Sequence, residues 1–280
     1  MFDSPARVGL VGLGNLGLPM ALHLIERGFE VAAYDTDGTR EAQVLDAGGD
    51  TGIAAALRCS YLCVVTPDDG PLSDLLGDLE QSSVEIVLLH STVLPQSVRT
   101  LGDRLGRMGI SLVDAPVSGG ADAARSGSLT ILAGGAPGAI DRADRVLSEL
   151  GEVRHLGGLG SASATKLANQ LALFGGLAAL YEGLSLTRSF DVPDVEALAA
   201  IHASTGDSWA ARHLSFFQQL VAEYDAANAP LETRPWRKDV REFEKAARGA
   251  GLPASLASLI SHSLGDRLEA EARDDSGAAE

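Results

Sequence analysis

Short apolar runs alternate with longer stretches of helical periodicity over the first 156 residues. Seven runs rich in Val, Ile, Leu and Ala are candidate strands, at residues 8–12, 31–35, 61–66, 86–90, 111–115, 130–133 and 153–156. Strands that alternate with helices are typical of a mainly parallel, doubly wound α/β sheet. The pattern predicts such a domain over residues 1–160.

The strand pattern stops after residue 160. Residues 161–189 read as one helix that is apolar almost all round, and at ~1.5 Å per residue it would be about 43 Å long. It is expected to join two domains. Residues 190–268 have a pattern typical of helices, with prolines at the expected helix boundaries, which predicts an all-α C-terminal domain. Residues 269–280 are acidic and lack an apolar face, so we expect a disordered tail.

A glycine-rich turn follows the first predicted strand and precedes a helix that should end at Gly28. Its residues are Gly12, Leu13, Gly14, Asn15, Leu16 and Gly17. Glycines at this spacing allow a tight turn and close approach of the backbone to a pyrophosphate, which predicts a Rossmann-type dinucleotide site. The alternative is a plain turn in a chain with 32 glycines. Asp35, at the end of the next strand, suits a ribose 2′-hydroxyl and favours NAD over NADP. Arg40 is a candidate for a 2′-phosphate contact or an exposed helix charge.

The run that continues from this turn to Ala21, with three later motifs, resembles the β-hydroxyacid dehydrogenase family. That family includes 3-hydroxyisobutyrate dehydrogenase, tartronate semialdehyde reductase and, more distantly, phosphogluconate dehydrogenase. The later motifs begin at Asp114-Ala-Pro-Val-Ser118-Gly119-Gly120, at Gly158-Leu-Gly160 before Lys166-x-x-Asn169-Gln170, and at Lys238-Asp239. The Gly-to-Lys spacing is longer than in the tightest family form. The resemblance spans residues 7 to about 265 and implies an NAD(P)-dependent oxidoreductase.

The segment Ser118-Gly119-Gly120 follows a predicted strand, where ligands bind in open α/β sheets. Two glycines leave backbone N–H groups unshielded, which suits a substrate carboxylate. The alternative is a strand-to-helix turn with Ser118 as the N-cap. With the family resemblance, we expect a small carboxylate substrate here.

Lys166, Asn169 and Gln170 stand at i, i+3 and i+4 of the long helix and so share one face. Because the surrounding residues are apolar, all three are expected to be buried. A hydrogen-bond network between domains would explain them structurally. The resemblance instead implies the interconversion of a β-hydroxy acid and its carbonyl product, with Lys166 as general acid/base. Desolvation and a neighbouring cation such as Lys238 would lower the lysine pKa. Asn169 and Gln170 would bind substrate, and their pairing is closer to the tartronate semialdehyde reductase branch.

Weaker signals complete the candidate site. Thr92, in a Ser-Thr-Val-x-Pro turn, should contact the nicotinamide ribose, although Leu89 stands where relatives often carry Asp. Thr66 and Pro67 either border the cofactor or form a strand-ending turn. Trp209 either shapes the substrate pocket or is an ordinary core aromatic. Lys238 is either a cofactor or substrate contact or part of a solvated basic helix face.

Composition limits the partners. A net charge of −16 disfavours binding to nucleic acid or to an anionic membrane. Cys59 and Cys63 match neither a zinc pair nor a redox motif and predict buried thiols, and the six histidines show no metal spacing. The missing signal sequence predicts a cytoplasmic protein. The Ala- and Leu-rich helical half suggests a homodimer or homotetramer.

The leading interpretation is therefore an NAD(P)-dependent dehydrogenase of short β-hydroxy acids. An imine reductase is a rival within the same class, but Lys166 argues against it. A non-catalytic dinucleotide-binding module is the rival from another class.

Overall fold

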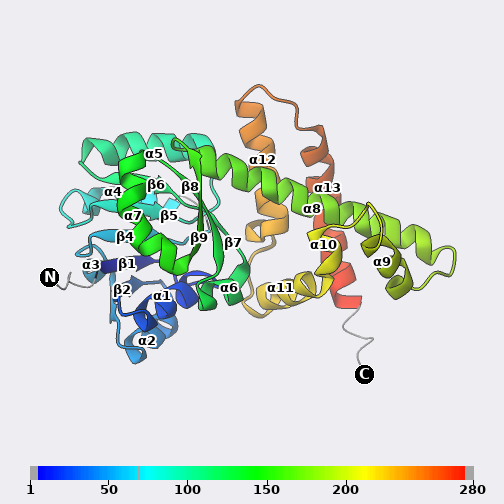
Figure 1. Cartoon of the computed structure of the whole chain (residues 1–280), viewed down its shortest axis with the longest axis horizontal. Coiled ribbons are helices and arrows are strands. Elements are labelled where there is room, and N and C mark those ends of the chain that lie inside the picture. The colour runs from blue at the N-terminus through cyan, green and yellow to red at the C-terminus, as the bar shows by residue number, and fades with distance from the viewer. Residues whose placement is uncertain (1–5, 68–69, 275–280) are drawn as a thin grey trace. The chain divides into compact units, whose positions relative to one another are not determined.

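The computed structural model describes residues 6–67 and 70–274 (Figure 1). The chain divides into two compact units, and the boundary falls between Lys166 and Leu167. This boundary lies inside a single helix, α8 (Ser161–Arg188), rather than before it. No helix within the described ranges is both long and apolar enough to cross a membrane.

A nine-stranded sheet forms the centre of the first unit. Its strands are β1 (Arg7–Val11), β2 (Glu30–Tyr34), β3 (Asp50–Thr51), β4 (Tyr61–Val64), β5 (Ile86–Leu89), β6 (Ser111–Asp114), β7 (Val117–Ser118), β8 (Leu129–Gly134) and β9 (Gly151–Gly157). The order is β3-β2-β1-β4-β5-β6-β8-β7, with β9 beside β8. The strands from β3 to β6 are parallel, whereas β8 runs antiparallel to β6 and β7. The doubly wound α/β fold is confirmed.

Helices cover both faces of this sheet because successive strand residues point to opposite sides. In β5, Ile86 and Leu88 join the core under one set of helices, and Val87 and Leu89 join the core under the other. The first set comprises α1 (Gly17–Glu26), α6 (Gly120–Ser126) and α7 (Pro137–Leu150). The second comprises α3 (Ile53–Ala56), α4 (Gly70–Leu79) and α5 (Pro95–Arg107). Helix α2 (Gly38–Asp46) follows β2.

All seven predicted strands are present, each within three residues of its predicted ends. The two strands that the pattern did not predict, β3 and β7, contain only two residues each. Such short strands carry no detectable alternation. Cys59 and Cys63 are buried free thiols as predicted, and burial raises the pKa of Cys63 to about 12.

The second unit contains helices joined by turns, and no strand occurs among its described residues. After α8 come α9 (Asp194–His202), α10 (Trp209–Arg212), α11 (Leu214–Ala226), the 3-10 turn η1 (Leu231–Thr233), α12 (Pro235–Gly249) and α13 (Ser255–Asp274). Pro193, Pro230 and Pro235 stand at helix starts, because proline lacks the N–H that a helix interior needs. The core of this unit surrounds Trp236 and Phe217.

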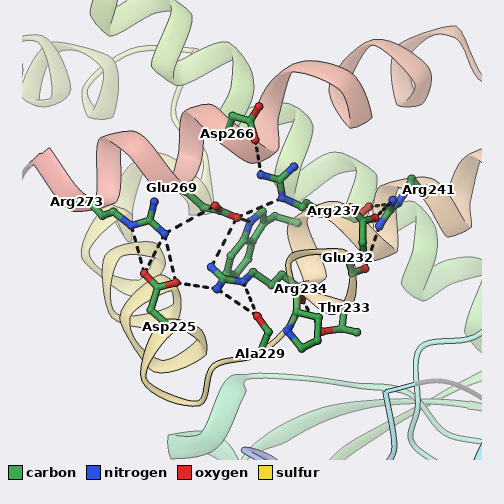
Figure 2. Close-up of polar contacts among 12 residues, drawn as sticks. Asp225, Ala229, Glu232, Thr233, Arg234, Arg237, Arg241, Asp266, Glu269 and Arg273 are labelled. Carbon is green, nitrogen blue, oxygen red and sulfur yellow. Dashed lines mark hydrogen bonds and ion pairs between the residues drawn. The ribbon is translucent and has the colours of Figure 1, made fainter.

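The predicted disordered tail begins too early. Helix α13 continues to Asp274, so residues 269–274 are helical, and residues 275–280 lie outside the described part. Glu269 is buried, and it accepts a hydrogen bond from the Trp236 indole at 3.1 Å and one from Arg237 at 3.3 Å. Figure 2 shows this carboxylate of α13 facing Arg234 and Arg237. In the sequence alone, an acidic residue that pairs with distant arginines cannot be distinguished from the acidic residues of a disordered tail.

Candidate active site

The glycine turn after β1 has the geometry of a dinucleotide cradle. Gly12 has φ +93, and a Cβ there would lie 2.3 Å from the Val65 carbonyl oxygen. A Cβ on Gly17 would lie 1.8 Å from the Gly12 carbonyl oxygen. Both glycines are therefore required by the fold itself. A Cβ on Gly14 would have no atom within 4 Å, so the missing side chain leaves open space beside the backbone. That is the space a pyrophosphate at the start of α1 would need.

Asp35 lies beside this turn and follows β2 directly. Its carboxylate accepts hydrogen bonds from the N–H of Leu13 at 2.5 Å and from the N–H of Asp37 at 2.9 Å. Arg40 makes ion pairs with both acids, at 3.7 Å to Asp35 and 3.4 Å to Asp37. Glu41 accepts from the Asp35 N–H at 3.3 Å. The residues of the cradle thus fit a dinucleotide, and the acids Asp35, Asp37 and Glu41 lie beside it with Arg40.

The turns after β4 and β5 meet at the same edge of the sheet. Thr66 donates its backbone N–H to the Ser91 hydroxyl at 3.0 Å, and the two hydroxyls are 3.2 Å apart. Thr66 also lies next to the glycine turn, since its Cγ2 is 3.2 Å from where a Cβ of Gly12 would stand. Pro67 follows Thr66, and Thr92 follows Ser91, which is buried. The structure thus brings these predicted cofactor residues to one edge with the cradle.

Ser118 ends β7, where it pairs with Thr130. The N-cap of α6 is Gly119, with φ +135, and Gly120 has φ +73. The alternative of Ser118 as a helix cap is therefore wrong, because its side chain makes no capping bond. Instead, the Ser118 hydroxyl accepts a hydrogen bond of 2.9 Å from the Lys166 Nζ.

Lys166 lies in the second turn of α8 and is only 7% exposed. Its contact with Ser118 joins positions 48 residues apart and unites the two motifs that the sequence marked for substrate and catalysis. A serine hydroxyl that accepts from an amine keeps its own hydrogen for a second acceptor. Such a pair can hold an oxygen-bearing group and exchange a proton with it.

The second unit holds the remaining polar residues of the motifs. Asn169 donates to Gln170 at 3.2 Å, and Gln170 donates to the Asp239 carboxylate at 2.7 Å. The Lys238 Nζ is 3.7 Å from the other Asp239 oxygen. Gln170 and Asp239 are buried, whereas Asn169 is exposed, so the prediction of three buried polar groups is wrong for Asn169.

The basic stretch around Lys238 is not a uniformly solvated face. Most of its cations are paired with acids within the unit, including Arg234 with Asp225 at 2.7 Å. The Arg234 side chain is 5% exposed and that of Lys238 is 17% exposed. Arg234 is therefore a buried structural cation, whereas Lys245 and Arg248 at the end of the same helix are 63% and 70% exposed.

Trp209 does not lie in the core. It is 49% exposed, begins α10, and stacks on His213 with ring centroids 4.2 Å apart. Phe216 and Phe217 meet its ring edge to face. The core alternative for Trp209 is wrong, because three aromatic neighbours hold the ring while leaving half of it accessible.

Two buried titratable groups near the candidate site were not predicted as functional. Asp114, which ends β6, is fully buried and bonds to the start of α8. His90, which follows β5, places Nδ1 2.8 Å from the Ala115 carbonyl oxygen, and burial lowers its pKa to about 4. Asp114 could have been found because it begins the motif that contains Ser118. His90 belongs to no motif, so the sequence offered no indication of its position. No three His, Cys, Asp or Glu side chains gather as metal ligands in the part of the chain that the structure describes.

Known proteins match both halves of the chain. Residues 7–158 match the NAD binding domain of 6-phosphogluconate dehydrogenase, and residues 160–279 match the NAD-binding region of NADP-dependent 3-hydroxyisobutyrate dehydrogenase. The human mitochondrial 3-hydroxyisobutyrate dehydrogenase is 30% identical over 269 residues, which cover 91% of this chain and 80% of the human protein.

Solved structures extend the likeness in fold. The 3-hydroxyisobutyrate dehydrogenase of Mycobacterium tuberculosis with L-serine has a TM-score of 0.79 and 23% identity over 92% of both chains. An imine reductase from Pseudomonas sp. has a TM-score of 0.59 and 20% identity over 90% of this chain and 98% of the other. At these identities the likeness concerns the fold.

The glycine turn, the doubly wound sheet and the similarity to known dehydrogenases together define an NAD(P)-dependent dehydrogenase of hydroxy acids. More particularly, the chain belongs to the β-hydroxyacid dehydrogenase family.

Proposed function

We propose that this dehydrogenase interconverts a short β-hydroxy acid and its semialdehyde or keto acid, with Lys166 as the general acid/base. The observation that carries the proposal is the 2.9 Å hydrogen bond from the Lys166 Nζ to the Ser118 hydroxyl. It joins the only lysine of the first unit to the segment proposed to bind the substrate carboxylate.

The proposed chemistry divides the work between cofactor and protein. The nicotinamide, when bound, supplies the hydride acceptor for the carbinol carbon. During oxidation, neutral Lys166 takes the hydroxyl proton, and during reduction the ammonium form returns a proton to the carbonyl oxygen. Ser118 and the N–H groups of Gly119 and Gly120 would hold the carboxylate. Asn169, an exposed residue whose amide donates to Gln170, would hold the substrate hydroxyl or carboxylate, and Gln170 would orient Asn169.

NAD is the proposed cofactor rather than NADP. Asp35 and Asp37 place two carboxylates at the corner where the adenosine ribose would lie, and Arg40 is paired with both of them. A 2′-phosphate would meet that negative charge, and binding it would require Arg40 to leave its partners. We expect kcat/KM with NAD to exceed that with NADP by at least about tenfold. Equal values, or a preference for NADP, would contradict this assignment.

The test of the function is an initial-rate screen of short β-hydroxy acids with each cofactor. Wild type is compared with Lys166→Ala and with Lys245→Ala, whose lysine is 63% exposed and paired only with Glu242 among the contacts described. Turnover of at least one acid that falls by about 10²-fold or more in Lys166→Ala alone supports the proposal. Turnover of imines without turnover of any hydroxy acid would favour an imine reductase. NADH binding with neither activity would favour a non-catalytic module.

A homo-oligomer is also part of the proposal. Large apolar side chains of the second unit stand open to solvent, among them Phe190 at 75%, Val195 at 70% and Leu259 at 67% exposed. Large exposed apolar side chains of this kind favour association with a second copy. Light scattering of the purified protein should give a dimer or tetramer mass, and a monomer mass at micromolar concentration would contradict the proposal. The cytoplasmic location stays a prediction.

A further inference from the structure

Asp114 holds the start of the helix that carries Lys166. Its carboxylate Oδ2 accepts the backbone N–H of Ser163 at 2.9 Å and that of Gly160 at 3.2 Å. Its Oδ1 accepts the Ser163 hydroxyl at 2.6 Å. The first N–H groups of a helix have no partner within the helix, so an acid at this position satisfies them and interacts favourably with the positive end of the helix dipole. Asp114 is thus a cap supplied from a distant strand.

A charged cap at this position carries a cost in free energy, because its carboxylate must be removed from water. Asp114 is fully buried, and burial raises the pKa of its carboxyl, although the hydrogen bonds from Ser163 and Gly160 oppose this shift. A neutral Asn or Ser at the helix start caps almost as well without placing a charge in the interior. A buried carboxylate with three bonds to one helical turn fixes that turn more tightly than a neutral cap, because hydrogen bonds to charged groups are the stronger ones.

The same short segment of chain contacts α8 a second time. Ser118 lies four residues after Asp114 and accepts the hydrogen bond from Lys166. Ser163 and Lys166 stand at i and i+3 of α8, so they lie on one side of the helix and about 4.5 Å apart along its axis. Residues 114–118 therefore hold one side of α8 at two consecutive turns. The first contact binds the start of the helix, and the second involves Lys166, to which we assign the proton transfer.

We propose that Asp114 is a positioning residue, which fixes the first turn of α8 and thereby aligns Lys166 with Ser118 and the substrate hydroxyl. The inference rests on the proposed function of Lys166. Displacement of a catalytic group by about 1 Å can cost as much as 10²-fold in rate. Loss of the charged cap should therefore lower turnover without a direct contact between Asp114 and substrate.

The test uses Asp114→Asn and Ser163→Ala in the full-length enzyme. Asn keeps the size of Asp but offers one oxygen acceptor in place of two, and Ser163→Ala removes only the bond to Oδ1. Turnover is expressed per NADH-binding site, so that misfolded protein does not count. We expect Asp114→Asn to lower kcat by about ten- to a hundredfold and Ser163→Ala to lower it less, with KM for the dinucleotide unchanged.

A double-mutant cycle separates positioning from general damage. If Asp114 acts through Lys166, Asp114→Asn should cause no further loss in the Lys166→Ala background, since groups that act as a unit are not additive. An equal fold-loss in both backgrounds would overturn the positioning role, as would unchanged kcat per site in the single variants. If Asp114→Asn does not fold, the double-mutant cycle of Ser163→Ala with Lys166→Ala tests the positioning role by the same criteria. Full activity in Lys166→Ala would instead overturn the proposed function itself.

Discussion

Gly14→Ala should separate cofactor binding from folding. A Cβ on Gly14 would meet no atom within 4 Å, and its φ lies outside the left-handed region. Alanine there therefore causes no strain in the protein, and the stiffer unfolded chain should stabilise it by about 0.4–1 kcal/mol. For a chain of this size, that corresponds to a midpoint of unfolding higher by roughly 1–4 °C.

The same methyl group would occupy the space in which we place the pyrophosphate. Loss of one hydrogen bond to that charged group costs about 1.5–3 kcal/mol, which weakens binding by about 10- to 150-fold. Titration with NADH, followed by its fluorescence, measures this change, and thermal unfolding without cofactor measures stability. A matched control is Gly138→Ala, where a Cβ also meets nothing within 4 Å at an exposed position of α7.

Gly17→Ala should show the opposite pattern. Its Cβ would lie 1.8 Å from the Gly12 carbonyl oxygen, so the backbone must shift, and stability should fall by about 1–3 kcal/mol or more. Gly14→Ala that bound NADH as tightly as wild type would refute the placement of the cofactor at this turn.

Two further predictions concern stability. His90 is buried, and its pKa is lowered from the ordinary value of 6.5 to about 4. The neutral side chain therefore contributes fully to the free energy of unfolding above about pH 6.5. This contribution is lost as the pH falls toward 4, up to a total on the order of 3 kcal/mol. His90→Gln should lower the slope of the unfolding free energy against pH in this window by the equivalent of about one bound proton. An unchanged slope would contradict a buried, neutral His90. Glu269→Ala should destabilise the second unit by about 1–3 kcal/mol, because the buried Trp236 indole and Arg237 lose an acceptor. Arg234 keeps its closer carboxylate partner, Asp225. Denaturant unfolding measures this loss, and a midpoint equal to that of wild type would contradict the buried contacts of Glu269.

The sheet could be predicted because its information is local. Each predicted strand is an apolar run bounded by turn residues, and the glycine turn after β1 has its own spacing. The two-residue strand β7 could not be predicted from alternation, although it carries Ser118. Its existence depends on pairing with β8, which only the folded chain provides.

The candidate site was predictable as a set of motifs but not as a set of contacts. The sequence marked Lys166 and Ser118 separately, and their hydrogen bond spans 48 positions. Burial was harder to predict, since helical spacing placed Asn169 with Lys166 on one face but could not show that Asn169 is exposed. Glu269 was misjudged for the same reason, because its hydrogen-bond donors Trp236 and Arg237 lie more than 30 positions away.

The most direct test of the account is chemical rescue of Lys166→Ala. If Lys166 is the proton-transfer group, the variant should lose about 10²- to 10⁴-fold in kcat while it retains NADH binding, and added methylamine or ethylamine should restore turnover in proportion to the free-base concentration. Lys245→Ala should match wild type and should not respond to the amine. An Lys166→Ala enzyme that turns over substrate like wild type, or whose lost activity no amine restores, would contradict the assignment of Lys166 as general acid/base.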